Sequence, residues 1–205
     1  MLISLETQNE LFYDDNSGGF FATPSDSKDL ILRLKDGMDS QEPSINGISA
    51  NNLRRLATLL GDDEYQKRAL ATTSAFSAEI LQHPFLFISM MPSIVTDNLG
   101  ARSILMAGNP LDPAIEKQLS KVRSEGLHSD VDVIFVNMEK WEENDEGLRW
   151  LAERNPTVKA AAEYVRKHGK AFVEVCAAGR CEMVETAPKE GFDMGDVLEV
   201  LKGME

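Results

Sequence analysis

Residues 13–24, YDDNSGGFFATP, and residues 33–62, RLKDGMDSQEPSINGISANNLRRLATLLGD, decide the fold of the N-terminal half of this chain. Aromatic residues flank a Gly-Gly pair, and glycine readily adopts the positive φ values that a tight reversal requires. The first stretch therefore predicts a hairpin of two short strands across residues 11–23. In the second stretch a polar, charged loop precedes apolar residues at helical spacing, and Gly61 stands at the position of a C-terminal cap. A helix is predicted from Ile48, with a core face made of Leu53, Leu56, Ala57 and Leu60.

A second predicted helix follows at once. It ends before Pro84, because proline disfavours helical geometry at the preceding residue. The next stretch, PFLFISMM at residues 84–91, is apolar on all sides, which predicts burial against several neighbours. The core face of the second helix is expected to contain Tyr65, Ala69, Thr72, Phe76 and Ile80.

The pattern changes after about residue 97. Runs rich in β-forming residues at 103–107, 131–136 and 171–176 now alternate with helical ones. Asp112 and Pro113 form an N-cap and first-turn pair for a helix between the first two strands, whose apolar face is expected to hold Ile115, Leu119 and Val122. This strand–helix–strand order predicts a parallel pair with a right-handed crossover.

Two further helices complete the C-terminal half. Asn155, which is followed by proline, starts the first of them, and Gly169 closes it. The second is predicted over residues 193–202. The sequence as a whole therefore predicts a mixed α/β fold, with helix hairpins in residues 1–96 and a small α/β (βαβ) unit in residues 97–205.

Composition limits the classes of function. With 205 residues, 42% of them hydrophobic, the chain is long enough for one sizeable core or two small ones. A formal net charge of -13 repels phosphate backbones, and no run of Lys and Arg overrides that field, so we expect no nucleic-acid binding. No apolar run approaches the roughly 18 residues of a membrane span. The first residues, MLISLE, lack the basic leader of a secretory signal, which predicts a cytoplasmic protein in a reducing compartment.

Several motifs, in their order along the chain, resemble the C-terminal part of the thioredoxin-domain-containing family of spermatogenesis-associated protein 20. Members of that family join a thioredoxin-like domain to a barrel of paired helices related to sugar epimerases and six-hairpin glycosidases. The family's usual Pro-Ser-Gly-Asn-Ser reads Pro-Ser-Ile-Asn-Gly at residues 43–47, so Ser49 is expected to take over a capping role. The motifs that carry the resemblance are GGFF, RLKDGMD, EPS-x-N, NLRRL, ILMAGNP and VEVCAAGRC.

The resemblance implies that residues 1–96 are a partial six-hairpin glycosidase-like toroid of helices, and that the chain is the tail of a longer protein. A barrel of helix hairpins closes only when each inner helix is covered by its neighbours. The apolar faces of the first 92 residues would then lack partners, and large exposed apolar patches usually mark an interface. We therefore expect the isolated chain to self-associate or to be poorly soluble.

The loop between the predicted hairpin and the first helix is the best candidate site, since loops at one mouth of the related barrels contact sugars. Carboxylates, amides and hydroxyls hydrogen-bond sugar hydroxyls, and paired carboxylates act as acid and base in glycoside cleavage. The same residue types also make turns and helix N-caps, and this structural alternative stays open. The candidate residues for a sugar-like ligand are Lys35, Asp36, Asp39, Glu42, Ser44 and Asn46.

The sequence indicates no catalytic set, no cofactor and no metal site. The candidate loop has no histidine to serve as a base, and His83, His128 and His168 are expected to be structural. Cys176 and Cys181 flank a Gly-containing loop that can return the strand as a hairpin and bring the two sulfur atoms close, so a disulfide is geometrically possible and a redox role is a candidate. Their spacing differs from that of a redox-active Cys-x-x-Cys start, and no second pair completes a zinc site. We therefore expect two reduced, partly buried thiols.

Two hypotheses follow from the sequence. The first takes the chain as a C-terminal fragment of a protein of carbohydrate-enzyme ancestry, with half of a sugar cleft and no activity by itself. The second takes it as a non-catalytic, redox-associated interaction module, whose α/β part and thiols dock on a thioredoxin-like domain or another protein.

Overall fold

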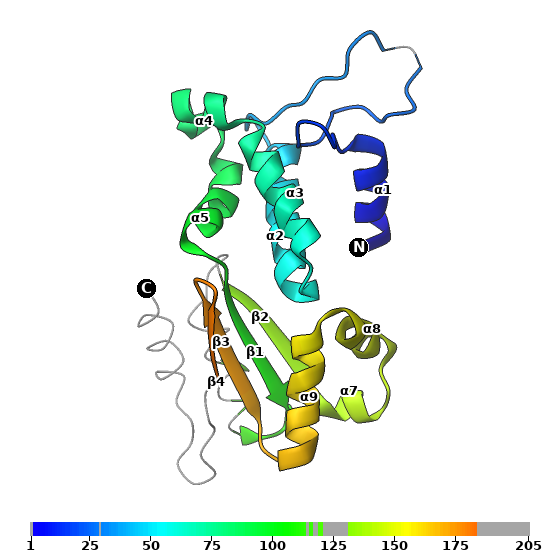
Figure 1. Ribbon diagram of the computed structural model, residues 1–205, viewed down its shortest axis with the longest axis vertical. Helices are drawn as coiled ribbons and strands as arrows, with labels where there is room; N and C mark the ends of the chain where they lie inside the picture. Colours follow the sequence, from blue (N-terminus) through cyan, green and yellow to red (C-terminus); the bar gives the residue numbers. More distant parts are fainter. Residues whose placement is uncertain (1, 29, 114, 117–118, 121–130, 184–205) are drawn as a thin grey trace. The chain divides into compact units, whose positions relative to one another are not determined.

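The computed structural model describes residues 2–28, 30–113, 115, 116, 119, 120 and 131–183, with side chains from Glu6 onward (Figure 1). The chain divides into two compact units. Of the described residues, unit 1 contains the stretches up to Ala57 and from Asp63 to Asp97, and unit 2 contains Thr58–Asp62 and those from Asn98 onward. Helices and a four-stranded sheet are both present, so the predicted mixed α/β class is confirmed. The barrel of paired helices stays a prediction.

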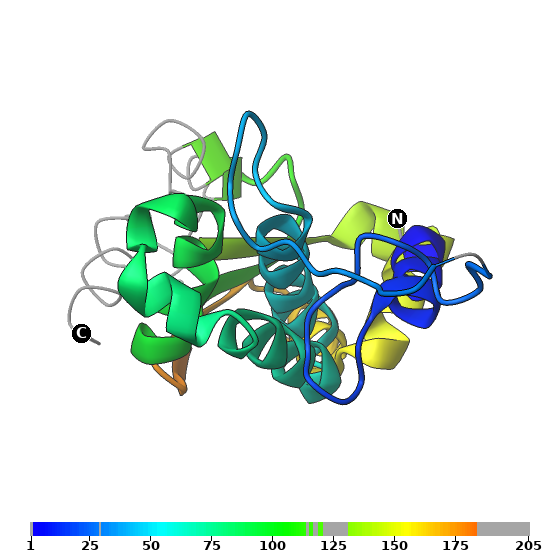
Figure 2. The ribbon, with the colours of Figure 1, turned by 90° about the horizontal axis from the view of Figure 1, so that it is seen from above.

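Unit 1 is helical. Arg54 and Asp97, from two of its helices, form a buried ion pair. Residues 22–28 and 30–36 form an irregular loop that extends away from the helices of this unit (Figure 1, Figure 2). The helices, some of which run a few residues past the limits of the unit, are α1 (Leu2–Phe12), α2 (Ile45–Leu60), α3 (Asp63–Ser74), α4 (Ser77–Gln82) and α5 (Met91–Leu99).

The predicted second helix is interrupted in the structure. It divides into α3 and α4, because the chain leaves helical geometry at Phe76, where φ is -114° and ψ is 14°. The Phe76 ring is buried in a small cluster with Phe87 and Met90. Packing of this one large side chain therefore outweighs the continuous helical spacing of the sequence.

The predicted N-terminal hairpin is only partly correct. Leu11 and Phe12 belong to α1, and isolated antiparallel bridges between Tyr13 and Phe20 and between Phe21 and Lys35 replace the two strands. The reversal itself is confirmed, since Gly18 and Gly19 have φ values of 71° and 78°. A Cβ at Gly18 would lie 2.3 Å from the Ala71 carbonyl oxygen, so this turn also needs glycine for space.

The apolar run at residues 84–91 is buried on one side only. It contains two 3₁₀ turns, Pro84–Leu86 and Ile88–Met90. Phe87 and Met90 are buried, whereas Phe85 is 67% exposed and Ile88 is 65% exposed, so the expected burial against several neighbours holds for only part of this run. Exposed apolar side chains are compatible with self-association, which stays a prediction.

Unit 2 is built on a mixed sheet with the strand order β2-β1-β3-β4. β1 pairs in parallel with β2, and antiparallel with β3, which forms a hairpin with β4. The three predicted strands are therefore confirmed, together with the predicted parallel pair. The bounds are Arg102–Gly108 for β1, Val131–Asn137 for β2, Phe172–Ala177 for β3 and Arg180–Met183 for β4.

Helix α9 (Pro156–His168) covers one face of this sheet, as Figure 1 shows. The Asn155 side chain caps its start by accepting hydrogen bonds from the N–H groups of Thr157 and Val158, and Gly169 closes it with a φ of 63°. Both ends were predicted from these residues. The shared core consists of Val158, Ala161 and Ala162 of the helix with Leu105, Ala107, Ile134, Val136 and Phe172 of the strands.

The remaining helices are short. α7 (Met138–Glu142) and α8 (Glu146–Arg154) lie between β2 and α9, and Asp145 caps α8. In the predicted crossover helix, residues 113, 115, 116, 119 and 120 are helical, while Val122 and the final helix at 193–202 lie outside the described residues. Among the helices that the structure describes, none is long and apolar enough to cross a membrane.

Candidate functional site

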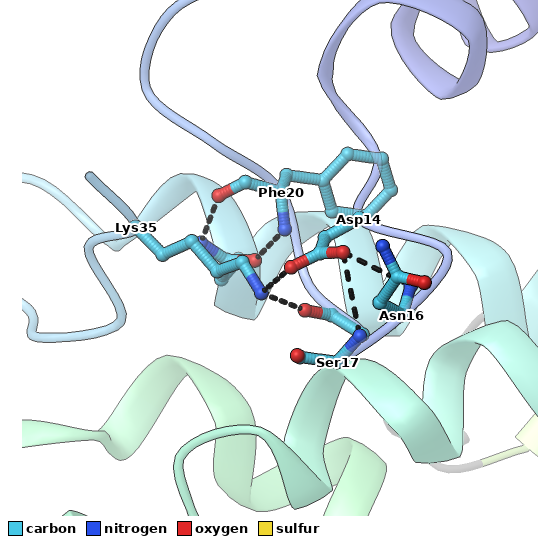
Figure 3. Close-up of polar contacts among 7 residues, drawn as sticks. Asp14, Asn16, Ser17, Phe20 and Lys35 are labelled. Carbon is cyan, nitrogen blue, oxygen red and sulfur yellow. Dashed lines mark hydrogen bonds and ion pairs between the residues drawn. The ribbon is translucent and has the colours of Figure 1, made fainter. Parts of the chain in front are cut away.

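The turn at residues 14–19 is held by a single carboxylate. Asp14 Oδ1 accepts hydrogen bonds from the N–H groups of Asn16 and Ser17 at 3.0 and 3.3 Å (Figure 3). Lys35, from the candidate loop, places its Nζ 2.6 Å from Asp14 Oδ2 and donates to the Gly18 carbonyl oxygen, also at 2.6 Å. The hydrogen bond from Lys35 lowers the pKa of Asp14 below its ordinary value of 3.8, and partial burial opposes this effect.

Asn46 joins three separate segments from a buried position in the first turn of α2. Its Oδ1 accepts a hydrogen bond from the Phe20 N–H at 2.6 Å, and its Nδ2 donates to the Phe20 carbonyl oxygen at 3.0 Å. The same Nδ2 donates to the Asp36 carbonyl oxygen at 2.8 Å. The side-chain amide thus pairs with the backbone of Phe20 as a neighbouring strand would, and it is only 1% exposed.

Asp39 fastens the loop to the 3₁₀ segment that follows α4. Its two carboxylate oxygens accept hydrogen bonds from the Ser44 N–H at 2.8 Å, the Ser89 N–H at 2.7 Å and the Ser89 hydroxyl at 2.5 Å. Burial alone would raise the pKa of Asp39, but these bonds together hold that pKa below its ordinary value of 3.8. A base of lowered pKa is a poor proton acceptor near neutral pH, so the arrangement favours a structural role.

Ser44 is the N-cap of α2. Its Oγ lies 3.1 Å from the Gly47 N–H, which donates to it, and 3.1 Å from the Ser89 Oγ. A Cβ at position 47 would lie 1.9 Å from the Ser89 Oγ, so the close approach requires glycine there. The expectation that Ser49 supplies the cap is wrong, because Ser49 is buried inside α2 and accepts a hydrogen bond from Gln8.

Asp36 and Glu42 are the two candidates whose side chains face solvent. The Asp36 carboxylate accepts a hydrogen bond from the Met38 N–H at 3.1 Å. Lys35, Asp39, Ser44 and Asn46 instead use their polar groups to hold the loop, as the structural alternative expects. Asp14 and Ser89 were not predicted as partners of this loop, although Asp14 lies inside the turn of residues 13–24.

The two histidines that the structure describes add no reactive group to this loop. His83 stands at the end of α4, and its ring lies 6.1 Å from that of Phe85. His168 is in the last turn of α9, with its ring 4.5 Å from that of Tyr164. His128 lies outside the described residues.

The second candidate position is the hairpin of β3 and β4. Cys176 and Cys181 are directly opposite each other in the strand register, with their Cα atoms 4.1 Å apart. They form a disulfide bond, so the expectation of two reduced thiols is wrong. The side chain of Cys181 is exposed, as are all residues of β4, whereas Cys176 is partly buried.

Glu174 is the third reactive group of this hairpin. It lies two residues before Cys176, on the same face of β3, and one of its carboxylate oxygens and the two sulfur atoms all lie within 4.8 Å of one another. Partial burial raises the pKa of Glu174. Glu174 was not predicted as a site residue, although the alternation of side chains in VEVCAAGRC places Glu174 and Cys176 on one face.

The fold and these positions define a mixed α/β chain with a hydrogen-bonded polar loop and a disulfide-linked hairpin at the edge of its sheet. The chain is related to the family of spermatogenesis-associated protein 20. The mouse and rat proteins of that name are each 33% identical to it over 106 residues, and the human protein is 31% identical over 105 residues.

These matches cover 51% of this chain and 13% of each relative, so the chain corresponds to a small part of the curated proteins that it matches. The resemblance to this family that the motifs indicate is therefore confirmed at the level of the sequence. No family model and no solved structure matches the chain.

The contacts of Asn46 predict a large local effect of Asn46→Ala. Truncation leaves the N–H and carbonyl of Phe20 and the carbonyl of Asp36 without their partner, which should destabilise unit 1 by about 2–3 kcal/mol. Hydrogen exchange measures this directly, because the Phe20 N–H should exchange about 30–150 times faster. Asn16→Ala, which removes an exposed side chain of the same turn, is the control. Unchanged protection of Phe20 would show that Asn46 does not hold this segment.

The lowered pKa values of Asp14 and Asp39 predict acid sensitivity. Carboxylates with a lower pKa in the folded state stabilise it fully above the unfolded pKa, and this contribution is lost as pH falls through the folded pKa, below 3.8. Asp39→Asn should destabilise the protein by about 2 kcal/mol at pH 7 and reduce the loss of stability below pH 4, because one of the two carboxylates is gone. Urea unfolding at several pH values measures both effects, with Asp15→Asn as the control for net charge. An acid dependence as steep as that of the original chain would contradict the role of Asp39.

Proposed function

We propose that the chain is a redox-associated interaction module of a longer protein, and that its Cys176 and Cys181 hairpin exchanges disulfides with a dithiol partner. The main support is the position of the pair, because an exposed edge hairpin presents one sulfur to solvent. In a reducing compartment, which the sequence analysis expects, disulfides are usually transient and serve catalysis or redox sensing. A thioredoxin-like domain is the proposed class of partner.

The exchange reaction assigns different roles to the two sulfur atoms. A thiolate of the partner attacks the Sγ of Cys181, since that residue is the exposed member of the pair. The bond between the two sulfurs breaks, its electron pair stays on Cys176 as a thiolate, and a mixed disulfide joins Cys181 to the partner. The second thiol of the partner then releases Cys181. The hairpin ends as two thiols and the partner as a disulfide, so two electrons have moved.

A second candidate function is sugar binding at the loop of unit 1, in a protein of carbohydrate-enzyme ancestry that is inactive in this fragment. It is favoured by the exposure of the Asp36 and Glu42 carboxylates on one short loop. It is weakened by the internal hydrogen bonds of Lys35, Asp39, Ser44 and Asn46. The redox-associated proposal is therefore the stronger of the two.

Disulfide exchange is tested by trapping. A thioredoxin-like protein that keeps only its attacking cysteine should form a mixed disulfide with the oxidised chain, and peptide mass spectrometry should find most of it on Cys181. The Cys176→Ser, Cys181→Ser double variant should form none.

The double variant must remain folded for this comparison, because loss of so short a disulfide loop costs about 2 kcal/mol. Its circular dichroism spectrum provides the check. Predominant attachment to Cys176, or no mixed disulfide with the oxidised original chain, would contradict the proposed exchange.

Sugar binding is tested by titration of the chain with mono- and oligosaccharides. If the second candidate is correct, calorimetry should show saturable binding that Asp36→Asn combined with Glu42→Gln abolishes. Glu79→Gln, which removes an exposed carboxylate from α4, should leave binding unchanged. Absence of saturable binding by the original chain would eliminate this function for the fragment.

A further inference from the structure

One face of the β3 and β4 hairpin carries three side chains that bind metal ions in other proteins. Cys176 and Cys181 oppose each other on this face, and Glu174 precedes Cys176 by two residues. One ligand atom from each of the three, a carboxylate oxygen and two sulfurs, lies within 4.8 Å of the other two. No second Cys or His pair completes a zinc site in the sequence, but the Glu174 carboxylate supplies a third group.

From this arrangement we infer that the reduced hairpin binds a zinc-class divalent ion through Glu174, Cys176 and Cys181, so that metal binding and disulfide formation exclude each other. The inference rests on the proposed function, because that function supplies the reduced state of the pair. It adds a ligand and a control by redox state to the same hairpin.

The chemistry of the three groups suits zinc. Thiolates are soft ligands that select ions such as Zn²⁺, and a carboxylate oxygen is an ordinary third ligand. Bonds of about 2.3 Å to sulfur and about 2.1 Å to oxygen in a tetrahedral site separate the ligand atoms by roughly 3.5–3.8 Å. The observed spacing therefore needs only small side-chain movements once the sulfurs are no longer bonded to each other. A fourth position stays open for water.

The two states of the hairpin differ by a balanced reaction. A dithiol reductant supplies two electrons and two protons, which convert the disulfide into two thiols while the reductant becomes a disulfide. Binding of the divalent ion then releases the two thiol protons to solvent, because cysteine binds metals as a thiolate. Oxidation of the pair removes both sulfur ligands at once, so the ion is released.

The test uses the full chain and Co²⁺ as a coloured probe for the zinc-class ion. The reduced chain, freed of reductant under nitrogen, should bind one Co²⁺ with cobalt–thiolate charge-transfer absorption that Zn²⁺ abolishes by displacement. The oxidised chain should show no such absorption. Glu174→Gln should weaken binding by at least about tenfold, since loss of a direct ligand exceeds the usual effect of its supporting groups.

Glu182→Gln is the matched control. Glu182 is an exposed carboxylate of the same hairpin, but it is paired with Val175 and therefore lies on the opposite face. Its substitution should leave the affinity for Co²⁺ unchanged. Equal weakening by both variants would reduce the effect to general charge and overturn the assignment of Glu174, as would unchanged binding by Glu174→Gln.

Failure of the inference can be told apart from failure of the proposed function. If the reduced chain gives no cobalt–thiolate absorption, while exchange with the dithiol partner proceeds in the presence of a chelator, the metal site is refuted and the exchange stands. If the partner does not exchange with the hairpin, but the chemically reduced chain binds Co²⁺ through Glu174, the exchange is refuted and the metal site stands as a property of the reduced chain.

Discussion

The structure of unit 1 depends on the pairing of one buried side-chain amide with the backbone. Among the residues that the structure describes, the segment around Phe20 has no neighbouring strand beyond isolated bridges, so its N–H and carbonyl need another partner. Asn46 supplies both bonds and a third to the Asp36 carbonyl oxygen. Because a buried polar group without a partner costs more than a made bond gains, this amide fixes where the turn and the loop meet α2.

The same constraint explains why the polar loop is a weak candidate for binding. A side chain whose polar groups already hydrogen-bond buried backbone groups would have to give up those bonds to bind a ligand fully. Asp39 and Ser44 are likewise engaged with Ser89, and Gly47 makes room for that contact. The reactive groups of the β3 and β4 hairpin are in the opposite situation, since Cys181 is exposed and Glu174 lies beside the disulfide without belonging to the core.

The sequence allowed some parts of this fold to be predicted because they depend on local rules. The strands of unit 2, the cap and end of α9 at Asn155 and Gly169, and the reversal at Gly18 follow from short patterns. The interruption of the helix at Phe76 and the hydrogen bonds of Ser89 to the loop could not be predicted, because they depend on contacts between segments distant in the chain. For the candidate site, residue types were informative, but the sequence does not show whether Asp39 faces solvent or Ser89. The spacing of Cys176 and Cys181 in the sequence likewise did not show that the Glu174 carboxylate lies close to both sulfur atoms.

The hairpin that carries the cysteines is the most local pairing of the sheet. β3 and β4 are joined by the two residues Ala178 and Gly179, both with positive φ, so the strands meet without help from distant parts of the chain. Hairpins form within about 1–10 μs, whereas β1 must find β3 across the whole stretch from Gly108 to Phe172, and long-range pairing is slow. During folding the two sulfur atoms therefore come together before the sheet is complete, and their oxidation does not have to await a finished protein.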